Sequence, residues 1–405
     1  MKYLVLALAF APAVLFGQLR TGLDVLIASD FDMLKNKRLA LIANSTSVSS
    51  TGESSIVLFQ KHRLDLRLVF APEHGFQIRD EAGKKISDGT LSNGLKLISL
   101  YGKTKQPTPD MLADIDAIVF DIQDIGTRCY TYISTMHLAM QAAEQCGKEF
   151  IVLDRPNPIA PIKADGMRLD TAFRSFVGQV PVPFIHALTI GELATLIKRE
   201  ELPSLKLTVV KMENYSREKF ADEYAAWKQS FVPPSPNIQS VNAMILYPAT
   251  VLLEGTAISE GRGTDLPFEQ IGAPFIDSKK LKAALGAQSG IEVEAVTFVP
   301  KSLKGKSASP KFEGERCNGV RFKITEREKV KPFELAVSLL VALYKLYPKQ
   351  MGLKEDFFDK LAGTNQLREM ILQGESPNAI LNAAKKSNAA FEQKQHAYWL
   401  YGAPQ

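Results

Sequence analysis

The sequence predicts an α/β protein whose main part is a Rossmann-like, doubly wound parallel sheet, followed by a smaller C-terminal α+β auxiliary domain. The predicted strands of the first part are nearly continuous apolar runs, which is typical of parallel strands buried on both faces. Helical segments separate most of these strands, as in a series of βαβ units. No G-x-G-x-x-G sequence follows the first strand, so a dinucleotide site of the Rossmann type is excluded.

Start and stop signals mark the helices of this first part. Thr108 is a predicted N-cap, followed by Pro109 at the first helical position. Gly147 closes a helix predicted at 134–146, and the Thr-Ile-Gly-Glu sequence at 189–192 is a predicted capping box for a helix that runs to about residue 199. The other elements predicted here are a helix at 54–62 and strands at 38–44, 66–71, 96–101, 117–124, 149–154 and 205–210.

The pattern changes after residue 158. Residues 173–184 are a predicted strand-rich connection, and the proline-dense segment 231–238 predicts an extended loop. The segment from about residue 278 onward carries few convergent polar residues. We therefore assign residues 21–275 to the Rossmann-like domain and residues 276–405 to an auxiliary domain that forms a wall. The auxiliary elements are helices at 278–285 and 333–346, strands at 293–298 and 319–324, and amphipathic segments near 354–372 and 376–386.

Composition excludes several classes of protein. The 405-residue chain is 45% hydrophobic and 23% charged, as in an ordinary globular protein. A net charge of +5, without basic runs that interleave aromatic residues, argues against nucleic-acid binding. Three cysteines without a C-x-x-C pair argue against both a disulfide framework and a zinc site.

The N-terminus predicts export. One early lysine, an apolar run from Tyr3 to Phe16 and a small residue, Gly17, are typical of a secretory signal peptide, residues 1–17. The run is shorter than the roughly 20 apolar residues that a membrane span needs. We expect the protein to be exported, into the periplasm or the medium, with no stable membrane insertion after cleavage.

Polar residues follow several strands of the predicted sheet. In open α/β sheets, ligands bind in the crevice outside the carboxyl ends of the strands. A single polar residue at the end of a strand is explained by a turn. A series of carboxylates and amides at successive strand ends predicts a binding site. These residues are Asn44, Glu73, His74, Tyr101, Asp121, Gln123, Asp124, Asp154, Arg155 and Asn157.

The segment 253–274 shows neither helical nor strand periodicity, and it is predicted to be a structured loop. It combines four glycines with Glu254, Glu260, Arg262 and Thr264. Glycine allows positive φ and close backbone approach to a ligand. The loop therefore offers acids, a fixed cation and a hydroxyl to a bound molecule; the alternative is a solvated cluster of turns.

Paired carboxylates favour glycoside hydrolysis, in which one acts as acid and the other as base or nucleophile. The candidate pairs are Glu73 with Glu81 and Glu254 with Glu260. Other chemistries fit less well: there is no G-x-S-x-G for a serine hydrolase, the five histidines are scattered, and Cys129 has no evident histidine partner. The Asp121–Asp124 segment departs from the D-x-D pattern of aspartyl-phosphate phosphatases.

The motifs, taken in order, carry a family resemblance. They are P-E-H-G (72–75), S-L-Y-G-K-T (99–104), F-D-I-Q-D-I-G-T-R (120–128), Y-T-Y-I-S-T-M (130–136), L-D-R-P-N-P (153–158), F-R-S-F-V-G (173–178), P-P-S-P-N (233–237) and E-G-T-x-x-S-E-G-R-G-T-x-x-P-F-E-x-x-G-A-P (254–274). From about residue 21 to the C-terminus, the chain resembles the exo-β-N-acetylmuramidase family typified by NamZ. The resemblance implies a Rossmann-like catalytic domain with an auxiliary domain, a cleft between them, and neither metal nor cofactor.

The resemblance also implies a substrate and roles for residues. Family members release N-acetylmuramic acid (MurNAc) from the non-reducing end of peptidoglycan fragments, MurNAc-GlcNAc saccharides. Glu73 is the expected acid/base, with Glu81, Glu254 and Glu260 as partners, although Gln77–Arg79 departs from the family pattern and affects the expected geometry of Glu81. The expected binding residues are Asn44, His74, Asp121, Gln123, Asp124, Arg128, Tyr132, Asp154, Arg155, Asn157, Asn237, Arg262 and Thr264.

Among these residues, Arg128, Arg155 and Arg262 are candidates for the lactyl carboxylate of muramic acid, because arginine binds carboxylates in a bidentate fashion. Covalent retaining, inverting and substrate-assisted routes all stay open. A non-catalytic binding protein and another hydrolase of wall fragments, an esterase or phosphatase, are the alternative functions. The oligomeric state is not determined by the sequence.

Overall fold

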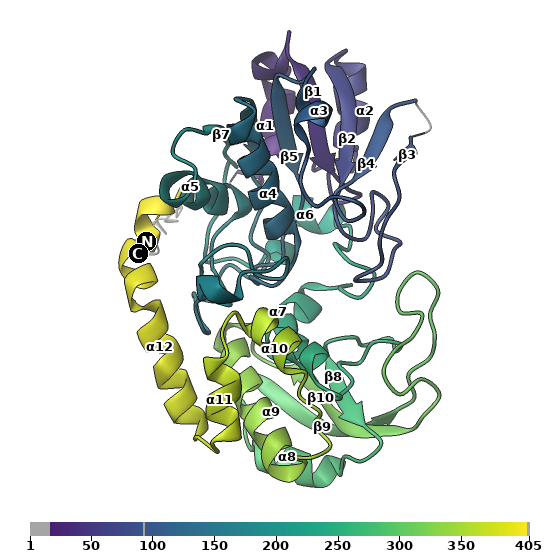
Figure 1. Cartoon of the computed structure of the whole chain (residues 1–405), viewed down its shortest axis with the longest axis vertical. Coiled ribbons are helices and arrows are strands. Elements are labelled where there is room, and N and C mark those ends of the chain that lie inside the picture. Colours follow the sequence, from purple (N-terminus) through teal and green to yellow (C-terminus); the bar gives the residue numbers. More distant parts are fainter. Residues whose placement is uncertain (1–16, 92–93, 403–405) are drawn as a thin grey trace, which may run out of the picture.

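The computed structural model describes residues 17–91 and 94–402, so the predicted signal peptide lies almost entirely outside the described part. A seven-stranded sheet has the order β3-β4-β2-β1-β5-β6-β7, and all neighbours are parallel except β3 and β4 (Figure 1). The predicted α/β fold class is confirmed. The strands are β1 (Arg38–Ala43), β2 (Asp65–Ala71), β3 (Gly89–Thr90), β4 (Lys96–Ser99), β5 (Ala117–Asp121), β6 (Glu149–Leu153) and β7 (Lys206–Val210).

Both faces of this sheet are buried, which explains the continuous apolar runs. In β1, Leu39 and Leu41 join one hydrophobic cluster, whereas Ala40 and Ile42 join the other. This alternation follows from the period of two in a strand. The helices of this sheet domain are α1 (Gly22–Ala28), α2 (Ser55–Lys61), α3 (Pro109–Leu112), α4 (Tyr132–Gln145), α5 (Ile190–Glu200) and α6 (Ala225–Gln229), with short 3-10 turns η1 (Asp32–Leu34), η2 (Thr171–Phe173) and η3 (Ala221–Glu223).

The predicted helix signals are confirmed in atomic detail. The Thr108 hydroxyl accepts a hydrogen bond from the Met111 amide at the start of α3. Thr189 and Glu192 form the predicted reciprocal capping box of α5. The prediction of a strand-rich connection at residues 173–184 is wrong, because this segment forms turns and isolated bridges. Its prolines lack the amide hydrogens that a strand ladder needs.

The C-terminal unit, α7 to η6, is a three-stranded antiparallel sheet, order β8-β10-β9, covered by helices. The segment 253–274 is not a loop throughout, since its end pairs with β10 as β8. The domain boundary at 275/276 stays a prediction. The elements are α7 (Val241–Thr250), η4 (Val251–Gly255), β8 (Gln270–Ala273), α8 (Ser278–Leu285), β9 (Ile291–Phe298), β10 (Cys317–Ile324), η5 (Arg327–Lys329), α9 (Pro332–Leu346), α10 (Glu355–Ala362), α11 (Gln366–Leu372), α12 (Pro377–Lys394) and η6 (Gln395–Tyr398).

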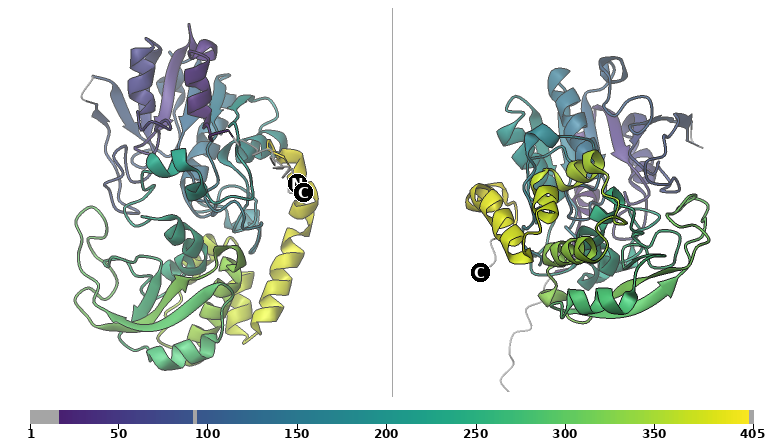
Figure 2. Two further views of the ribbon diagram at one scale, coloured as in Figure 1. Left: turned by 180° about the vertical axis from the view of Figure 1, so that it is seen from behind. Right: turned by 60° about the horizontal axis from the view of Figure 1, so that its bottom comes forward.

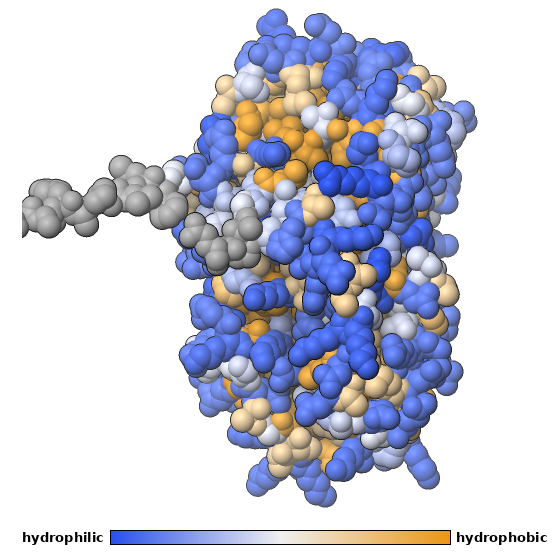
Figure 3. Space-filling model, turned by 90° about the vertical axis from the view of Figure 1, so that its left-hand side faces the viewer, coloured by the Kyte–Doolittle hydropathy of each residue, from blue (hydrophilic) through white to orange (hydrophobic). Residues whose placement is uncertain are grey.

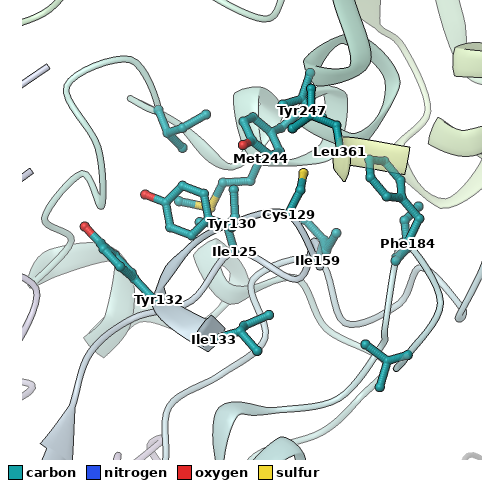
Figure 4. Packing of buried hydrophobic residues seen from close by; sticks show 14 of the residues in the cluster. Ile125, Cys129, Tyr130, Tyr132, Ile133, Ile159, Phe184, Met244, Tyr247 and Leu361 are labelled. Atoms are coloured by element: carbon teal, nitrogen blue, oxygen red, sulfur yellow. The ribbon is translucent and has the colours of Figure 1, made fainter. Parts of the chain in front are cut away.

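A buried aromatic contact joins the sheet domain to the C-terminal unit (Figure 4). Tyr130 lies just before α4 and meets Tyr247 of α7 edge to face, with ring centroids 5.9 Å apart. Both residues belong to one continuous core cluster, which also includes Leu361 of α10. Because this core continues from one unit into the other, the two walls of the space between them are held in a defined relation.

The chain end forms a strap back to the sheet domain. Helix α12 runs from the C-terminal unit alongside the molecule to α5 (Figures 1 and 2). The Tyr401 hydroxyl donates to the buried Asp154 carboxylate (2.6 Å), the Leu400 amide donates to Glu192 (2.8 Å), and the Tyr398 hydroxyl donates to Glu200 (2.6 Å).

The surface on the left-hand side of Figure 1 is mostly hydrophilic (Figure 3). Hydrophobic residues gather in its upper half, over the sheet domain.

We expect the Tyr401→Phe variant to lose about 1–3 kcal/mol of unfolding free energy, because a hydrogen bond to a charged group is lost. Burial raises the pKa of Asp154 from 3.8 to about 7, and the Tyr401 hydroxyl opposes that rise. Stability from this group therefore falls as pH rises from 3.8 towards 7, where the unfolded chain holds fewer protons than the folded one.

Without the hydroxyl, the pKa of folded Asp154 rises further, and the fall in stability continues to higher pH. The loss in Tyr401→Phe should thus be larger at pH 8 than at pH 5, as measured by denaturant unfolding. Tyr398→Phe is the control, because its partner Glu200 is exposed. An equal loss at both pH values would contradict the coupling between Tyr401 and Asp154.

Among the described residues, no helix is both long enough and apolar enough to span a membrane.

Candidate active site

A cavity of about 380 Å³ lies between the sheet domain and the C-terminal unit. It brings together residues that were selected from the sequence, among them Glu73, His74, Glu81, Glu254 and Arg262. Three carboxylates from two distant parts of the chain thus share one space. The other lining residues are Ala82, Gly83, Tyr101, Cys129, Tyr130, Thr131, Val177, Ser235, Ile238, Tyr247, Phe268, Lys306, Ser307, Ser309, Phe357 and Leu361.

Glu73 follows β2 after a single proline and is 7% exposed. Both of its carboxylate oxygens are held. The Gly83 amide donates to Oε1 (2.7 Å), and the Thr131 hydroxyl at the start of α4 donates to Oε2 (2.5 Å). These two donors orient the carboxylate within the cavity, as catalysis by a positioned acid or base requires.

His74 adopts a backbone conformation that is rare for a residue with a side chain, with φ of 68°. Such strain costs on the order of 1–3 kcal/mol and is found preferentially at functional sites. Burial lowers the pKa of His74, against the opposing charge of Glu73, so the imidazole is neutral at pH 7. Its Nδ1 lies 2.7 Å from the Asp80 carbonyl. Because a carbonyl can only accept, Nδ1 carries the proton and Nε2 is free to accept a hydrogen bond.

Tyr101 and Cys129 line the cavity in their protonated forms. Burial, together with the charge of Glu73, raises the pKa of the Tyr101 hydroxyl, which leaves it a hydrogen-bond donor. Burial also raises the pKa of the Cys129 thiol to about 12. A protonated thiol is a poor nucleophile, so thiol catalysis is not favoured.

The segment 253–274 contributes an ion-pair network to the opposite wall. Arg262 lies 2.7 Å from Glu254 and 3.2 Å from Glu260, and Lys311 lies 3.0 Å from the other oxygen of Glu260. Burial raises the pKa of Glu254, and Arg262 only partly offsets this. For Glu260, burial acts in the same direction, but Lys311 and Arg262 outweigh it and lower the pKa.

Two glycines bend the backbone around this network. Gly261 and Gly263 have φ of 83° and 80°, as the glycine-rich sequence led us to expect. Between them, Arg262 stacks its guanidinium over Phe268, 4.9 Å from the ring centroid. Thr264 does not line the cavity; its hydroxyl donates to the Gly261 carbonyl (2.6 Å) and closes the turn.

The loop between β9 and β10 forms a third part of the wall. The Ala308 amide donates to Glu81 Oε2 (2.7 Å), and the Asn237 side chain donates to the Lys306 carbonyl (2.8 Å). Glu81 and Asn237 therefore hold this loop against the sheet domain. Sequence reasoning missed Lys306 and its serine neighbours, because a polar run of lysine and serine has no feature that separates a cavity wall from a solvated loop.

Most of the strand-end residues do not reach this cavity. Asp121 accepts from Arg155 (2.7 Å), and Gln123 bonds two backbone carbonyls and accepts from the indole of Trp227 (3.0 Å). Helix α6, which carries Trp227, covers this part of the sheet edge and leaves a space of about 20 Å³. These polar groups bond one another inside the protein, except for Asp121 Oδ2, which has no hydrogen-bond partner among the described residues. Their roles in binding stay predictions.

The remaining predicted binding residues are also engaged internally. Asn44 accepts from the Thr46 hydroxyl, Asp124 accepts from the Gly126 amide, and Asn157 donates to the Leu188 carbonyl. Asp154 anchors the C-terminal strap, and the Tyr132 hydroxyl donates to the Pro234 carbonyl. These contacts engage at least one polar atom of each of five side chains that were expected to bind substrate: Asn44, Asp124, Tyr132, Asp154 and Asn157.

Arg128 is fully buried and has no carboxylate partner among the described residues. Its guanidinium donates to carbonyls of Met167 and Val182 in the sheet domain and to those of Leu361 and Ala362 at the end of α10. Burial lowers its pKa to about 10, which still leaves it charged at neutral pH. Arg128 thus joins the two units through the carbonyl end of a helix, where a cation is favoured.

Among the described residues, no group of three or more histidine, cysteine, aspartate and glutamate side chains is arranged to hold a metal ion.

Comparison with known proteins covers almost the whole chain. A family model described as exo-beta-N-acetylmuramidase NamZ, N-terminal, matches residues 39–242, and its C-terminal counterpart matches residues 245–401. The peptidoglycan beta-N-acetylmuramidase NamZ of Bacillus subtilis (strain 168) is 41% identical over 392 residues, which are 95% of this chain and 92% of that protein.

Two solved structures share the fold. Both are DUF1343 family proteins from Bacteroides fragilis NCTC 9343. One has a TM-score of 0.84 at 33% identity, covering 95% of this chain and 99% of its own. The other has a TM-score of 0.76 at 28% identity, covering 96% of this chain and 100% of its own.

The carboxylate-lined cavity and these similarities place the protein among the glycoside hydrolases. More narrowly, the chain belongs to the NamZ exo-beta-N-acetylmuramidase family, since the two family models together match most of its length.

Proposed function

We propose that the protein is an exo-acting glycosidase that releases MurNAc from the non-reducing end of peptidoglycan fragments by carboxylate acid/base catalysis. One observation carries the proposal: the buried Glu73 carboxylate, oriented by two donors, shares a single cavity with Glu81 and Glu254. The volume of about 380 Å³ lies at the lower end of the ~300–1,000 Å³ typical of small-molecule sites. Such a space suits a terminal sugar unit, as exo-action requires.

In the proposed reaction, Glu73 protonates the glycosidic oxygen as the bond to the anomeric carbon breaks. Water then adds to that carbon, and a carboxylate of the cavity takes up the proton that the water loses. The neutral His74 and the Tyr101 hydroxyl supply an acceptor and a donor for the sugar. Glu81 and Glu254 are the candidates for the second carboxylate, and the covalent, inverting and substrate-assisted routes remain open.

The substrate is tested with para-nitrophenyl β-MurNAc beside the corresponding N-acetylglucosaminide, and with MurNAc-GlcNAc saccharides that end in either sugar. We expect cleavage of the muramide only, and release of free MurNAc only from saccharides that carry it at the non-reducing end. Cleavage within longer chains would contradict exo-action. Ester or phosphate hydrolysis without glycoside cleavage would replace the proposal with another hydrolase activity.

We also propose that the protein acts outside the cytoplasm, in the periplasm or the medium, where peptidoglycan fragments are found. The apolar N-terminal run with Gly17 supports export. Expression of the full chain followed by N-terminal sequencing of the exported form tests this. A mature protein that begins soon after Gly17 is the expected result, and retention of Met1 would contradict it.

Thr131 should position Glu73, because its hydroxyl donates to Oε2 at 2.5 Å. We expect Thr131→Val to lower kcat by about tenfold or more, since a hydrogen bond to a charged group is worth about 1–3 kcal/mol. KM and the unfolding midpoint should change little, because the two side chains have similar shapes. Thr131→Ser keeps the hydroxyl and should retain most of the activity; equal losses in both variants would assign Thr131 a packing role.

A further inference from the structure

The cavity holds few positive charges that are free to act on a substrate. His74 is neutral because burial lowers its pKa. Arg262 is already shared between Glu254 and Glu260, at 2.7 and 3.2 Å. Within residues 17–91 and 94–402, the Lys306 ammonium has neither a hydrogen bond nor an ion pair. Among the described residues that line the cavity, Lys306 is therefore a cation that no carboxylate neutralises, unlike Arg262.

The backbone of Lys306 is fixed although its side chain is exposed. Its amide donates to the Leu303 carbonyl (3.0 Å), and its carbonyl accepts from Asn237 (2.8 Å). Two residues later, the Ala308 amide is bonded to Glu81 (2.7 Å). The long β9–β10 loop thus extends from the small sheet toward the sheet domain (Figure 1) and is pinned at two points there.

Gly305 makes this close approach possible. Its φ is 76°, and a side chain at this position would meet the Arg79 carbonyl at 3.1 Å. The loop therefore presents Lys306 at a defined place on the cavity wall, with Ser307 and Ser309 beside it. A fixed backbone lowers the ordering cost of a contact made by the side chain.

We propose that Lys306 binds the carboxylate of an anionic sugar and so determines the specificity of the site. This inference rests on the proposed function and identifies the group that would distinguish muramic acid from a neutral amino sugar. The cavity carboxylates Glu73, Glu81 and Glu254 repel an anion, so a carboxylated sugar needs a cation that none of them has neutralised. None of the three arginines predicted for this role is free: Arg128 bonds carbonyls, Arg155 pairs with Asp121, and Arg262 pairs with two glutamates.

The test compares Lys306→Gln, Lys306→Arg and a control, Lys304→Gln, on the same loop but outside the cavity lining. The substrates are para-nitrophenyl β-MurNAc and the same glycoside with its lactyl carboxyl converted to the carboxamide. For Lys306→Gln we expect KM for the acid to rise about tenfold or more, the scale of a lost hydrogen bond to a charged group, with kcat nearly unchanged. KM for the amide should not change.

Lys306→Arg should keep most of the preference for the acid, and Lys304→Gln should behave as wild type. Raising the salt concentration should weaken wild-type binding of the acid but not of the amide, because an exposed ion pair is screened. Unchanged KM in Lys306→Gln, or an equal change for acid and amide, would overturn the inference.

Failure of the proposed glycosidase activity can be distinguished from failure of this inference about Lys306. If the wild type cleaves neither glycoside, calorimetric titration with free MurNAc and with N-acetylglucosamine still measures recognition of the carboxylate. Binding of MurNAc that is lost in Lys306→Gln would support the inference without hydrolysis. Absence of any difference between the two sugars, or between the two proteins, would overturn it.

Discussion

Replacing Glu73 by glutamine is expected to lower kcat for muramide hydrolysis by about 10²–10⁴-fold, the usual contribution of a positioned acid or base. The amide has nearly the shape of the carboxylate but can neither deliver nor accept the proton. Its oxygen can still accept from the Gly83 amide, and the Thr131 hydroxyl can turn to accept from the new NH₂ group. We therefore expect the unfolding midpoint to stay close to that of the wild type.

Controls distinguish a lost acid from a general disturbance. Glu313→Gln removes an exposed carboxylate from the β9–β10 loop and should retain full activity. Activity that survives in Glu73→Gln would move the acid to another residue. Glu254 is then the first candidate, because burial raises its pKa and a catalytic acid must hold its proton near the working pH.

Replacing Arg262 by methionine is expected to cost about 3–5 kcal/mol of unfolding free energy, because it leaves the buried Glu260 and the half-buried Glu254 with one cation fewer. Glu254 would lose its 2.7 Å partner, whereas Glu260 would keep Lys311 at 3.0 Å. Denaturant unfolding at pH 7 measures the loss. Activity should fall as well, since the variant disturbs the wall that carries Glu254.

The double variant Glu254→Gln with Arg262→Met tests the cause. Removing the carboxylate together with its partner should restore part of the stability, so the two single losses should not add. Arg262→Lys keeps the charge but not the fork that reaches both glutamates, and an intermediate loss is expected. Additive losses in the double variant would show that Arg262 stabilises the site through its stacking on Phe268 instead.

Local signals made the sheet and several helix ends predictable. The apolar runs at 38–44 and 117–124 indicated strands that are buried on both faces of a sheet. The capping box of Thr189 and Glu192 depends on contacts within a single turn. The strand-rich prediction for 173–184 was wrong because prolines limited pairing in a segment that packs irregularly. Residues close together in the chain determine buried strands and helix caps, so these features can be predicted from the sequence.

The site was predictable only in part. Glu73, Glu81 and Glu254 were identified as carboxylates near glycine-containing turns, and the structure brings them into one cavity. Asp121 and Gln123 share the strand-end position of Glu73, yet helix α6 covers this part of the sheet edge, and most of their polar atoms are bonded inside the protein. A strand-end residue does not reveal from sequence whether a ligand or another part of the chain will occupy the space above it.

The sequence by itself determined the layered α/β fold, the principal helix ends and the set of carboxylates from which the acid is drawn, because periodicity, capping and motif spacing are local properties. Only the tertiary structure decided which charges are available. It placed Arg128 against four carbonyls and Arg262 between two glutamates, and it brought the β9–β10 loop with Lys306 to the cavity. Electrostatic interactions depend on the distance between the groups in space. Residues more than 200 positions apart, such as Glu81 and Ala308, come into contact only in the folded chain.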